Sequence, residues 1–477
     1  MIRKRKIIEC MLCLILSACM VGPDYERPQF FDNEAIEKAL ELKVGQFDES
    51  VVDPFLFQDE TLNNLFLKAL KSAPDIRSAY ARIEQAHALL QSNIASVFPS
   101  FDIGGGYNYK KTGRNMGTLF DENIYQAGLS VAWEVDLFGQ KRRAIEAGSA
   151  KEREMIAALK NIQVSLISDV ATTYLNLRMN EKLCKESRAD LKIQQALYDL
   201  TLDKYHSGLS NAIELNQARY QLENVRASIP KLEEQIELNK NALALLVGVL
   251  PGQLDRELNQ DKNNLITKTF KYDLTSLNEL SVDVVYNRPD VMAAEEQLIG
   301  QNAAVGQAVA EMLPSVNLSA FFGFESLKFP KLFHNHSYAY GYEPTINAPV
   351  FHFGALYQNL MLQKAIKKEQ QIYYEQVLLQ AINEIKNALI SLNKEFLRYK
   401  ALDEAWQKMD EAAQLARDKY KSGLIDYFVV LDAEERRISA QANLTTSAAQ
   451  LYKNVIAFYR AIGGSSLHQT DEDGSSR

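Results

Sequence analysis

Two stretches of the chain alternate between apolar and polar residues, and each is long enough for two strands joined by a turn. The first lies between Pro99 and Phe138, and the second lies between Pro314 and Phe353. Because successive side chains of a strand point to opposite faces, this period predicts two β-hairpins, each with one apolar face. Each strand has about the nine to eleven residues that cross a bilayer. The apolar positions include Phe101, Ile103, Tyr107, Tyr109, Tyr125, Leu129, Val131 and Trp133 in the first hairpin, and Leu318, Phe322, Tyr338, Tyr340 and Tyr342 in the second.

A helical pattern follows each hairpin and is far longer than the helices of globular domains. Between Gln140 and Tyr205 there is no proline, and between Ala355 and Lys421 there is neither proline nor glycine. In the second run apolar residues recur at alternating steps of three and four, which is typical of a coiled-coil seam. At about 1.5 Å per residue, each run predicts a rod of roughly 100 Å.

Each rod ends at a turn that contains a glycine. Tyr205 and Gly208 mark the first turn, and Tyr420 and Gly423 mark the second. Glycine is favoured there because a helix C-cap commonly needs a residue in the left-handed conformation. A second helix is expected to return from each turn, so the sequence predicts two long helical hairpins.

The same landmarks recur at one constant offset along the chain. Pro74 returns as Pro289, Gly139 as Gly354 and Gly248 as Gly463, and the residue numbers of each pair differ by 215 (289 − 74, 354 − 139 and 463 − 248). Two copies of one unit without a net insertion produce such an offset. The expected domains are a signal peptide over 1–18, a lipidated N-terminal segment over 19–60, a first repeat over 61–248, an inter-repeat segment over 249–288, a second repeat over 289–463 and a polar tail over 464–477.

The N-terminus has the features of an export signal. Residues 3–6 are basic, and the stretch from Ile7 to Ile15 is mostly apolar. The sequence Leu-Ser-Ala-Cys that ends at Cys19 matches a bacterial lipobox, in which cleavage before the cysteine leaves a thiol that carries diacylglycerol. We therefore expect Cys19 to be lipidated.

Charge and cysteine content exclude several classes of protein. The formal charge of −8 becomes −11 for a chain that begins at Cys19, because residues 3–6 carry +4 and Glu9 carries −1. This balance disfavours nucleic acid as a partner. Cys184 would be the other cysteine of the mature chain, so no intrachain disulfide is expected. Beyond the N-terminus no apolar run reaches the length of a membrane-spanning helix, so strands would have to do any spanning.

Four motifs carry a family resemblance. They are Cys-Met-Val-Gly-Pro-Asp-Tyr-Glu-Arg-Pro from Cys19, Trp-Glu-Val-Asp-Leu-Phe-Gly from Trp133, Arg-Pro-Asp-Val from Arg288 and Val-Leu-Asp-Ala from Val430. Together they resemble the signatures of TolC-like outer-membrane efflux ducts, and most closely the lipoprotein branch typified by OprM and NodT. The likeness covers essentially the whole mature chain. The residue after the lipidated cysteine is Met20, and not the aspartate that would favour retention in the inner membrane.

The resemblance implies a trimer, and backbone hydrogen bonding independently requires more than one chain. Four strands cannot close, and open sheet edges are not tolerated in lipid. The expected fold is mainly α with a membrane β-barrel. An internally duplicated unit, with four strands and long coiled-coil helices per chain, would form a trimeric 12-stranded β-barrel on an α-helical barrel. The expected location is the bacterial outer membrane, with a lipid anchor at Cys19 and the helices in the periplasm.

The implied function is that of an outer membrane exit duct in a tripartite efflux system. Such a duct is a passive channel, coupled through a periplasmic adaptor (a membrane fusion protein) to an inner-membrane pump of RND type that exports drugs or other small molecules. The sequence identifies neither the cargo nor the adaptor and pump. Two alternatives stay open, namely an exit duct for type I protein secretion and a lipid-anchored coiled-coil scaffold without a pore.

The resemblance also assigns a periplasmic gate. Asp432 lies at the acidic ring of the family, and Phe428, one turn earlier on the same face, matches its apolar constriction. Val429 departs from relatives with a second aspartate there, so we expect a single acidic ring. Three aspartates on one axis would attract cations and raise one another's pKa. The equivalent of Asp432 in the first repeat is Gln217.

Other chemistry is weakly indicated. There is no Gly-rich phosphate loop, His-Glu-x-x-His motif or nucleophile elbow, so neither enzyme activity nor a cofactor is expected. His334 and His336 lie two residues apart in a polar turn, but two ligands without Cys or carboxylate partners make a weak metal site. Gly208 and Gly423 are helix caps first, and adaptor docking at these turns is implied only by the resemblance.

Overall fold

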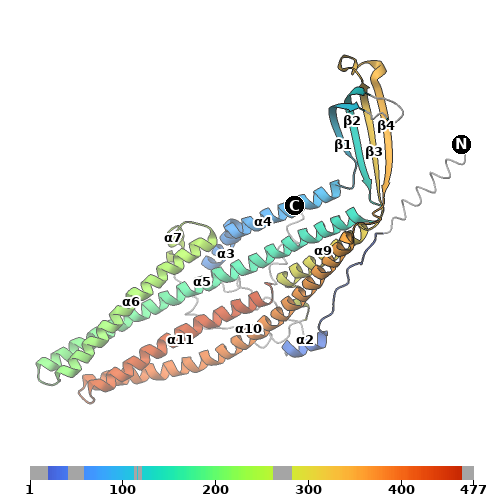
Figure 1. The fold of residues 1–477 in the computed structure, drawn as a ribbon. Coiled ribbons are helices and arrows are strands. Elements are labelled where there is room, and N and C mark those ends of the chain that lie inside the picture. Colours follow the sequence, from blue (N-terminus) through green and yellow to red (C-terminus); the bar gives the residue numbers. More distant parts are fainter. Residues whose placement is uncertain (1–19, 41–58, 112–114, 116–120, 261–281, 465–477) are drawn as a thin grey trace. The chain divides into compact units, whose positions relative to one another are not determined.

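The chain forms two compact units, and each contains parts of both repeats. The first unit consists of Met1–Gln29, Ala81–Ile156 and Ala293–Gln376, and the second of Phe30–Tyr80, Ala157–Met292 and Val377–Arg477. The computed structural model describes residues 20–40, 59–111, 115, 121–260 and 282–464. Figure 1 labels their helices and strands. The expected signal peptide and Cys19 lie outside the described residues.

Helices make up most of the described chain. They are α2 (Asn33–Leu40), α3 (Glu60–Ser72), α4 (Pro74–Ala95), α5 (Gln140–His206), α6 (Ala212–Val247), α7 (Asp255–Gln260), α8 (Asp283–Tyr286), α9 (Pro289–Ala310), α10 (Ala355–Lys421) and α11 (Tyr427–Ala461). α5 and α10 contain 67 residues each, which confirms the two long runs. Among the described residues, no helix combines the length and the apolar character needed to cross a membrane.

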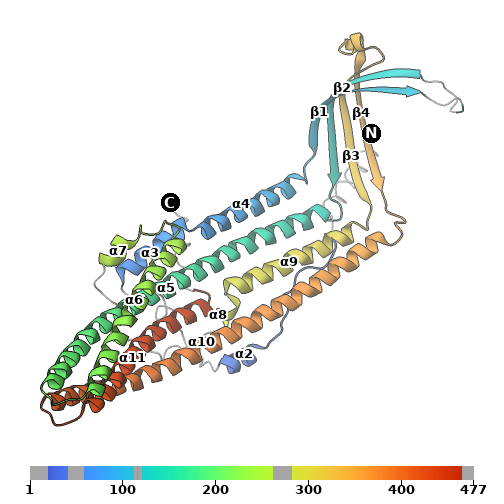
Figure 2. The ribbon, with the colours of Figure 1, turned by 60° about the vertical axis from the view of Figure 1, so that its left-hand side comes forward.

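The first unit contains an antiparallel sheet with the strand order β1-β2-β3-β4, which Figures 1 and 2 show from two sides. The strands are β1 (Ser100–Lys111), β2 (Asp121–Val135), β3 (Ser315–Ser326) and β4 (Tyr338–Asn347). Two single-turn 3-10 helices, η6 (Phe329–Lys331) and η7 (Asn335–Ser337), connect β3 to β4. Both predicted hairpins are present, and β2 pairs with β3 where the two repeats meet.

The four strands share one apolar face. Leu129 of β2 pairs with Ile103 of β1 on one side and with Phe322 of β3 on the other. Phe322 in turn pairs with Tyr340 of β4, so a row of apolar side chains crosses the whole sheet. Residues two apart lie on the same face of a strand, so Tyr107, Trp133 and Tyr342 join this face, and Asp102, Glu134 and Glu343 lie on the opposite one. In the single chain the apolar face is bare, with Ile103 89% and Tyr340 72% exposed.

The two hairpins have the same register after the repeat offset. Ser100 pairs with Ala132 in the first hairpin, and Ser315 pairs with Asn347 in the second. Adding 215 to the numbers of the first pair gives those of the second (315 − 100 and 347 − 132). The long helices behave in the same way, because the same offset relates both ends of α5 to those of α10 (355 − 140 and 421 − 206). The internal duplication is therefore confirmed.

In the second unit, α3 contacts the middle of α5 and the end of α6. Asp59 caps α3 by accepting a hydrogen bond from the Leu62 N–H at 3.0 Å. The same carboxylate accepts a bond from the Tyr174 hydroxyl of α5 at 2.8 Å. Gly248 ends α6 with a φ of 80°, and a Cβ there would lie 2.9 Å from the Ser72 carbonyl oxygen at the end of α3. A side chain at position 248 would therefore force the two helix ends apart.

Replacing Gly128 by alanine should weaken the sheet. A Cβ at Gly128 would lie 2.6 Å from the Phe322 carbonyl oxygen and 2.7 Å from the Gly323 Cα, so β2 and β3 would have to separate. Such overpacking costs about 1–3 kcal/mol. The thermal loss of β-strand circular dichroism in detergent should therefore move down by several degrees.

Gly104→Ala is the matched control, because no atom lies within 4 Å of a Cβ at that position. It should leave the thermal transition unchanged. Equal transitions for both variants would contradict the close approach of β2 and β3.

Candidate functional site

Both long helical hairpins turn through the same backbone motif. Gly208 has a φ of 73°, and its N–H donates to the Tyr205 carbonyl oxygen at 3.0 Å. Gly423 has a φ of 74°, and its N–H donates to the Tyr420 carbonyl oxygen at 3.0 Å. In each turn the next N–H reaches the carbonyl oxygen five residues earlier, at 2.8 and 2.9 Å. These paired bonds form a Schellman motif, which confirms both glycines as helix caps.

The two turns lie side by side in the second unit and are joined through Tyr420 (Figures 1 and 2). Lys204 Nζ donates to the Tyr420 carbonyl oxygen at 2.7 Å and lies 3.6 Å from the centroid of its ring. The Tyr420 hydroxyl lies 3.1 Å from Thr201 Oγ1. Tyr420 is buried, whereas Tyr205, its equivalent in the first repeat, is 40% exposed. The second-repeat tyrosine therefore holds the two hairpins together, and the first-repeat tyrosine does not.

The two expected gate residues lie on an exposed stripe of α11. Phe428 is 67% exposed. Asp432 is also exposed, and both of its carboxylate oxygens accept hydrogen bonds from Arg436 Nε, at 2.9 and 3.0 Å. An exposed pair of this kind contributes about 0.3–0.5 kcal/mol. Arg436 is not among the residues predicted for the gate, although an oppositely charged residue four positions away on a helix is a recognisable signal of such a pair.

The opposite face of α11 is buried and carries charges. Arg437 Nη2 lies 2.5 Å from Asp190 of α5, and Arg437 Nε lies 3.0 Å from Glu434. Glu434 also pairs with Arg417 of α10. The four residues form a network that joins α5, α10 and α11, which we call the buried charge network. Because buried charges are stable only when paired, these contacts restrict how the three helices can shift.

Glu186 lies one helical turn from Asp190 of this network, and its surroundings shift the pKa of its carboxyl group. Glu186 of α5 accepts hydrogen bonds from the Thr445 hydroxyl of α11, at 3.1 Å to each carboxylate oxygen. Burial raises the pKa of Glu186. The folded state therefore binds this proton more tightly than the unfolded state, so its contribution to stability is present at low pH and is lost as pH rises through the raised pKa.

In the first unit, residues Met20–Arg27 form an N-terminal segment that is held by a buried arginine. Arg143 of α5 is 1% exposed in its side chain. It donates to the carbonyl oxygens of Val21 and Gly22 at 3.2 Å each. It also donates to the Asp24 carboxylate at 2.9 Å. One side chain thus binds Val21, Gly22 and Asp24 of the segment.

Two further contacts fix the N-terminal segment against α9. Arg27 forms two hydrogen bonds with the Glu295 carboxylate, at 2.6 and 2.7 Å, and the Tyr25 hydroxyl donates to it at 3.1 Å. Gly22 has a φ of 96°, and a Cβ there would lie 2.5 Å from the Gly306 Cα. The Val-Gly-Pro-Asp-Tyr motif, which carries much of the family resemblance, is therefore a packing motif in this structure.

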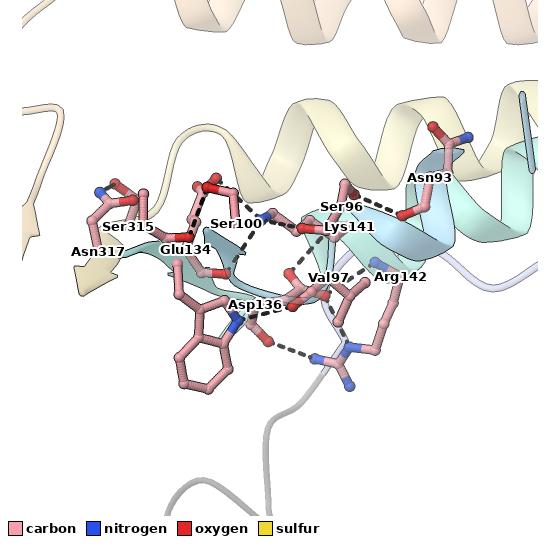
Figure 3. Close-up of polar contacts among 12 residues, drawn as sticks. Asn93, Ser96, Val97, Ser100, Glu134, Asp136, Lys141, Arg142, Ser315 and Asn317 are labelled. Atoms are coloured by element: carbon pink, nitrogen blue, oxygen red, sulfur yellow. Dashed lines mark hydrogen bonds and ion pairs between the residues drawn. The ribbon is translucent and has the colours of Figure 1, made fainter. Parts of the chain in front are cut away.

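Figure 3 shows the junction between β2 and α5. The Asp136 carboxylate accepts hydrogen bonds from the backbone N–H groups of Lys141 and Arg142, at 3.2 and 3.0 Å, and from Arg142 Nε at 3.1 Å. The Asp136 carboxylate thus accepts hydrogen bonds from N–H groups in the first turn of α5, which have no acceptor within the helix. Lys141 Nζ reaches back to the Ser96 carbonyl oxygen at 2.7 Å. The second repeat has Phe351 in place of Asp136, so the junction of β4 and α10 lacks this cap.

The two loop histidines lie on each other in the connection between β3 and β4. The His334 and His336 rings stack with centroids 5.4 Å apart and planes inclined by 20°. Across the described residues, no group of three or more His, Cys, Asp or Glu side chains is placed to hold a metal ion. His334 directly precedes η7, and His336 lies within it.

The model of the family described as outer membrane efflux protein matches residues 65–249 and 280–464. The bounds of the second match exceed those of the first by 215 (280 − 65 and 464 − 249), in agreement with the duplication. The two matches cover well over half of the chain. The chain belongs to the outer membrane efflux protein family.

Similar proteins extend this likeness over almost the full length. The solvent efflux pump outer membrane protein SrpC of Pseudomonas putida is 27% identical over 470 residues, which cover 97% of this chain and 98% of SrpC. The probable outer membrane lipoprotein SilC of Salmonella typhimurium is 26% identical over 468 residues, which cover 97% and 99%. The structure of the outer-membrane channel OprN matches with a TM-score of 0.85 at 29% identity and covers 94% of this chain and 99% of OprN. The expected fold class, outer membrane location and efflux function are confirmed.

Removing the Arg437 charge should destabilise the second unit. Arg437→Met leaves Asp190 and Glu434 buried without this partner, and breaking a buried ion pair typically costs about 3–5 kcal/mol. Denaturant unfolding of the solubilised protein, followed by helical circular dichroism, should show a lower midpoint.

The neighbouring Arg436 provides the matched control, because it lies on the exposed face of the same helix. Arg436→Met should change the free energy of unfolding by less than about 0.5 kcal/mol. If the two substitutions had equal effects, the buried charge network would not be a stabilising element.

Proposed function

We propose that this protein is the trimeric exit duct of a tripartite efflux system. A periplasmic adaptor couples it to an inner-membrane pump of RND type, which supplies the energy for transport. Among similar proteins, SrpC is named for solvents, TtgI of Pseudomonas putida for toluene and CusC of Escherichia coli for cations. These relatives are equally distant from this chain, at 26–27% identity, so they do not single out one cargo. The cargo class is therefore small molecules or ions.

The sheet of the first unit is the observation that carries the proposal. Its bare apolar face suits lipid, and its polar face suits a water-filled lumen. The outer sides of β1 and β4 would leave backbone N–H and C=O groups without partners in hydrocarbon, which is costly. Three copies supply twelve strands and can close the sheet, with each open edge paired to that of another copy.

The exposed stripe on α11 supports a gate at the helical turns. Phe428 and Asp432 are exposed within the part of the chain that the structure describes, so they are available to face the axis of a trimer. Because Asp432 pairs with Arg436 in each chain, the proposed trimer would have a ring of alternating charges at this level, and not the expected acidic ring. Gln217 at the equivalent position leaves the first repeat without an acid there.

The turns themselves suit the docking of an adaptor. Leu209 and Leu424, which follow the capping glycines, are 77% and 73% exposed. They make the outer end of each turn apolar, and each Schellman motif keeps its backbone in one conformation. An adaptor with apolar side chains at its own end would cover these leucines.

Conductance and export together test the proposal. The oligomer mass in detergent and the current through planar bilayers should be measured on one sample, and trimers with discrete conductance steps are expected. Deletion in the native host should raise the accumulation of an efflux dye. Loss of a secreted protein without a change in small-molecule sensitivity would indicate type I secretion. A folded protein without channels, even after Phe428→Ala and Asp432→Ala, would indicate a scaffold.

Asp432→Ala should widen the gate and make its net charge more positive. The substitution removes the acid and leaves Arg436 without this partner, so block by multivalent cations should weaken and selectivity should shift toward anions. Single-channel recording in bilayers measures both. Asp418→Ala is the control, since Asp418 is also an exposed acid near the turns. Unchanged block and selectivity for Asp432→Ala would remove this residue from the gate.

Cys19→Ala should abolish lipidation without removing the duct from the membrane. Incorporation of labelled palmitate should fall to background, while the strands still hold the protein in lipid. Cys184→Ala, at a buried cysteine of α5, should keep full labelling. Labelling that persisted in Cys19→Ala would place the lipid on another residue.

A further inference from the structure

We propose that the connection between β3 and β4 binds the phosphorylated lipid of the outer leaflet, lipid A. This β3–β4 connection comprises residues 327–337 and includes η6 and η7. Phe329 and Phe333 enter the acyl region of the leaflet, and Lys328 and Lys331 bind the phosphate groups. The inference rests on the proposed function, because that function places the apolar face of the sheet in lipid.

The β3–β4 connection lies at the outer end of the sheet. α9 precedes β3 and α10 follows β4, so both helices join the sheet at one end and the connection closes the other. Figures 1 and 2 show it beyond the ends of β3 and β4. Because the helices of this outer membrane protein extend into the periplasm, the connection lies on the side of the outer leaflet.

Two aromatic contacts fold the connection onto the apolar face. The rings of Phe329 and Tyr125 have centroids 5.6 Å apart. Those of Phe333 and Phe324 are 5.7 Å apart. Tyr125 and Phe324 are an even number of residues from the apolar row of their own strands, so both belong to the apolar face. Phe329 and Phe333 are still 64% and 71% exposed, so they extend this face beyond the strands.

Hydrogen bonds tie the backbone of both lysines to serines at the two ends of the connection. Ser326 Oγ donates to the Lys328 carbonyl oxygen at 2.9 Å and accepts from the Lys328 N–H at 3.2 Å. Ser337 Oγ donates to the Lys331 carbonyl oxygen at 2.7 Å. Leu332, which follows the second lysine, is buried. A backbone that is held before binding loses less conformational freedom when a ligand arrives.

The charge of the connection is positive and is not neutralised within it. Residues 327–337 contain no aspartate or glutamate. Lys328 and Lys331 are exposed, and neither forms an ion pair with the residues that the structure describes. Glu325, the nearest acid along β3, bonds to Gln126 on the polar face of the sheet. Lysines beside apolar side chains at a membrane surface attract anionic headgroups.

The aromatic residues set the depth of the lysines in the membrane. Aromatic rings of outer membrane strands gather at the level of the headgroups. Tyr125 and Tyr338 lie at this end of the apolar face, and the connection packs beside them. Lysine stems are long enough to reach phosphates while their carbons stay on apolar surface. Because the exposed phenylalanines continue the face that lipid covers, a lipid is the occupant that fits both halves of the site.

Binding of lipid A to the full-length protein in neutral detergent tests the site. Native mass spectrometry measures the affinity for diphosphoryl lipid A and for the same lipid after removal of both phosphates. The unsubstituted protein should prefer the diphosphoryl form. Lys328→Ala with Lys331→Ala should abolish this preference, with a loss of roughly fivefold for each lysine, and should leave the affinity for the dephosphorylated lipid unchanged. Lys328→Arg with Lys331→Arg should keep the preference, because the charges remain.

Two further variants separate charge from apolar contact. Lys394→Ala with Lys408→Ala removes the same charge from exposed positions of α10 in the second unit and should leave the preference intact. Phe329→Ser with Phe333→Ser should weaken the binding of both lipids by a similar factor, because these side chains contact the acyl chains and not the phosphates.

Several results would overturn the site. They are equal affinity of the unsubstituted protein for both lipids, an unchanged preference after Lys328→Ala with Lys331→Ala, and an equal loss in the Lys394→Ala with Lys408→Ala control. Stronger displacement of lipid A by sodium phosphate than by sodium chloride of the same ionic strength would indicate a site for free phosphate instead. Normal conductance in such a case would leave the proposed function in place. An unsubstituted protein without trimers or channels would instead overturn the proposed function itself.

Discussion

Backbone hydrogen bonding at the two open edges of one sheet is the constraint on which the rest of this protein depends. Lipid can cover the bare apolar face, but it offers no hydrogen-bond partner to backbone N–H and C=O groups at a sheet edge. Four strands cannot meet this demand alone. A chain that carries two equivalent hairpins presents both kinds of edge, and a long helix follows each hairpin in the sequence.

The two repeats keep one backbone but differ in the side chains at equivalent positions. Asp136 caps α5, whereas Phe351 in the same place leaves the start of α10 without that cap. Asp432 of α11 is charged, whereas its equivalent in α6 is Gln217. Backbone geometry is preserved because strand register and helix caps tolerate few alternatives. The side chains at the remaining positions differ between the repeats.

The charges of α11 differ in how strongly they hold the helix. Asp432 and Arg436 are exposed, so water already solvates them and their pairing adds little. Arg437 and Glu434 are buried, so each depends on its partners. The proposed gate would have to change its contacts while its frame stays intact. In this helix the weakly held pair faces outward, and the strongly held network faces the helices behind it.

Local and periodic features of this protein were determined by the sequence alone. The two-residue period of the strands, the three- and four-residue spacing of the helices and the capping glycines involve residues that are close in the chain. The constant offset is a pattern repeated along it. They predicted the hairpins, the long helices and the duplication, and the motifs predicted the family. Burial was decided only by the tertiary structure. Arg143 and Arg437 are each preceded directly by another arginine, and only the packing of distant helices makes one of each pair a buried anchor. The pairing of β2 with β3 is likewise a contact between distant residues, and on it the arrangement of the whole sheet depends.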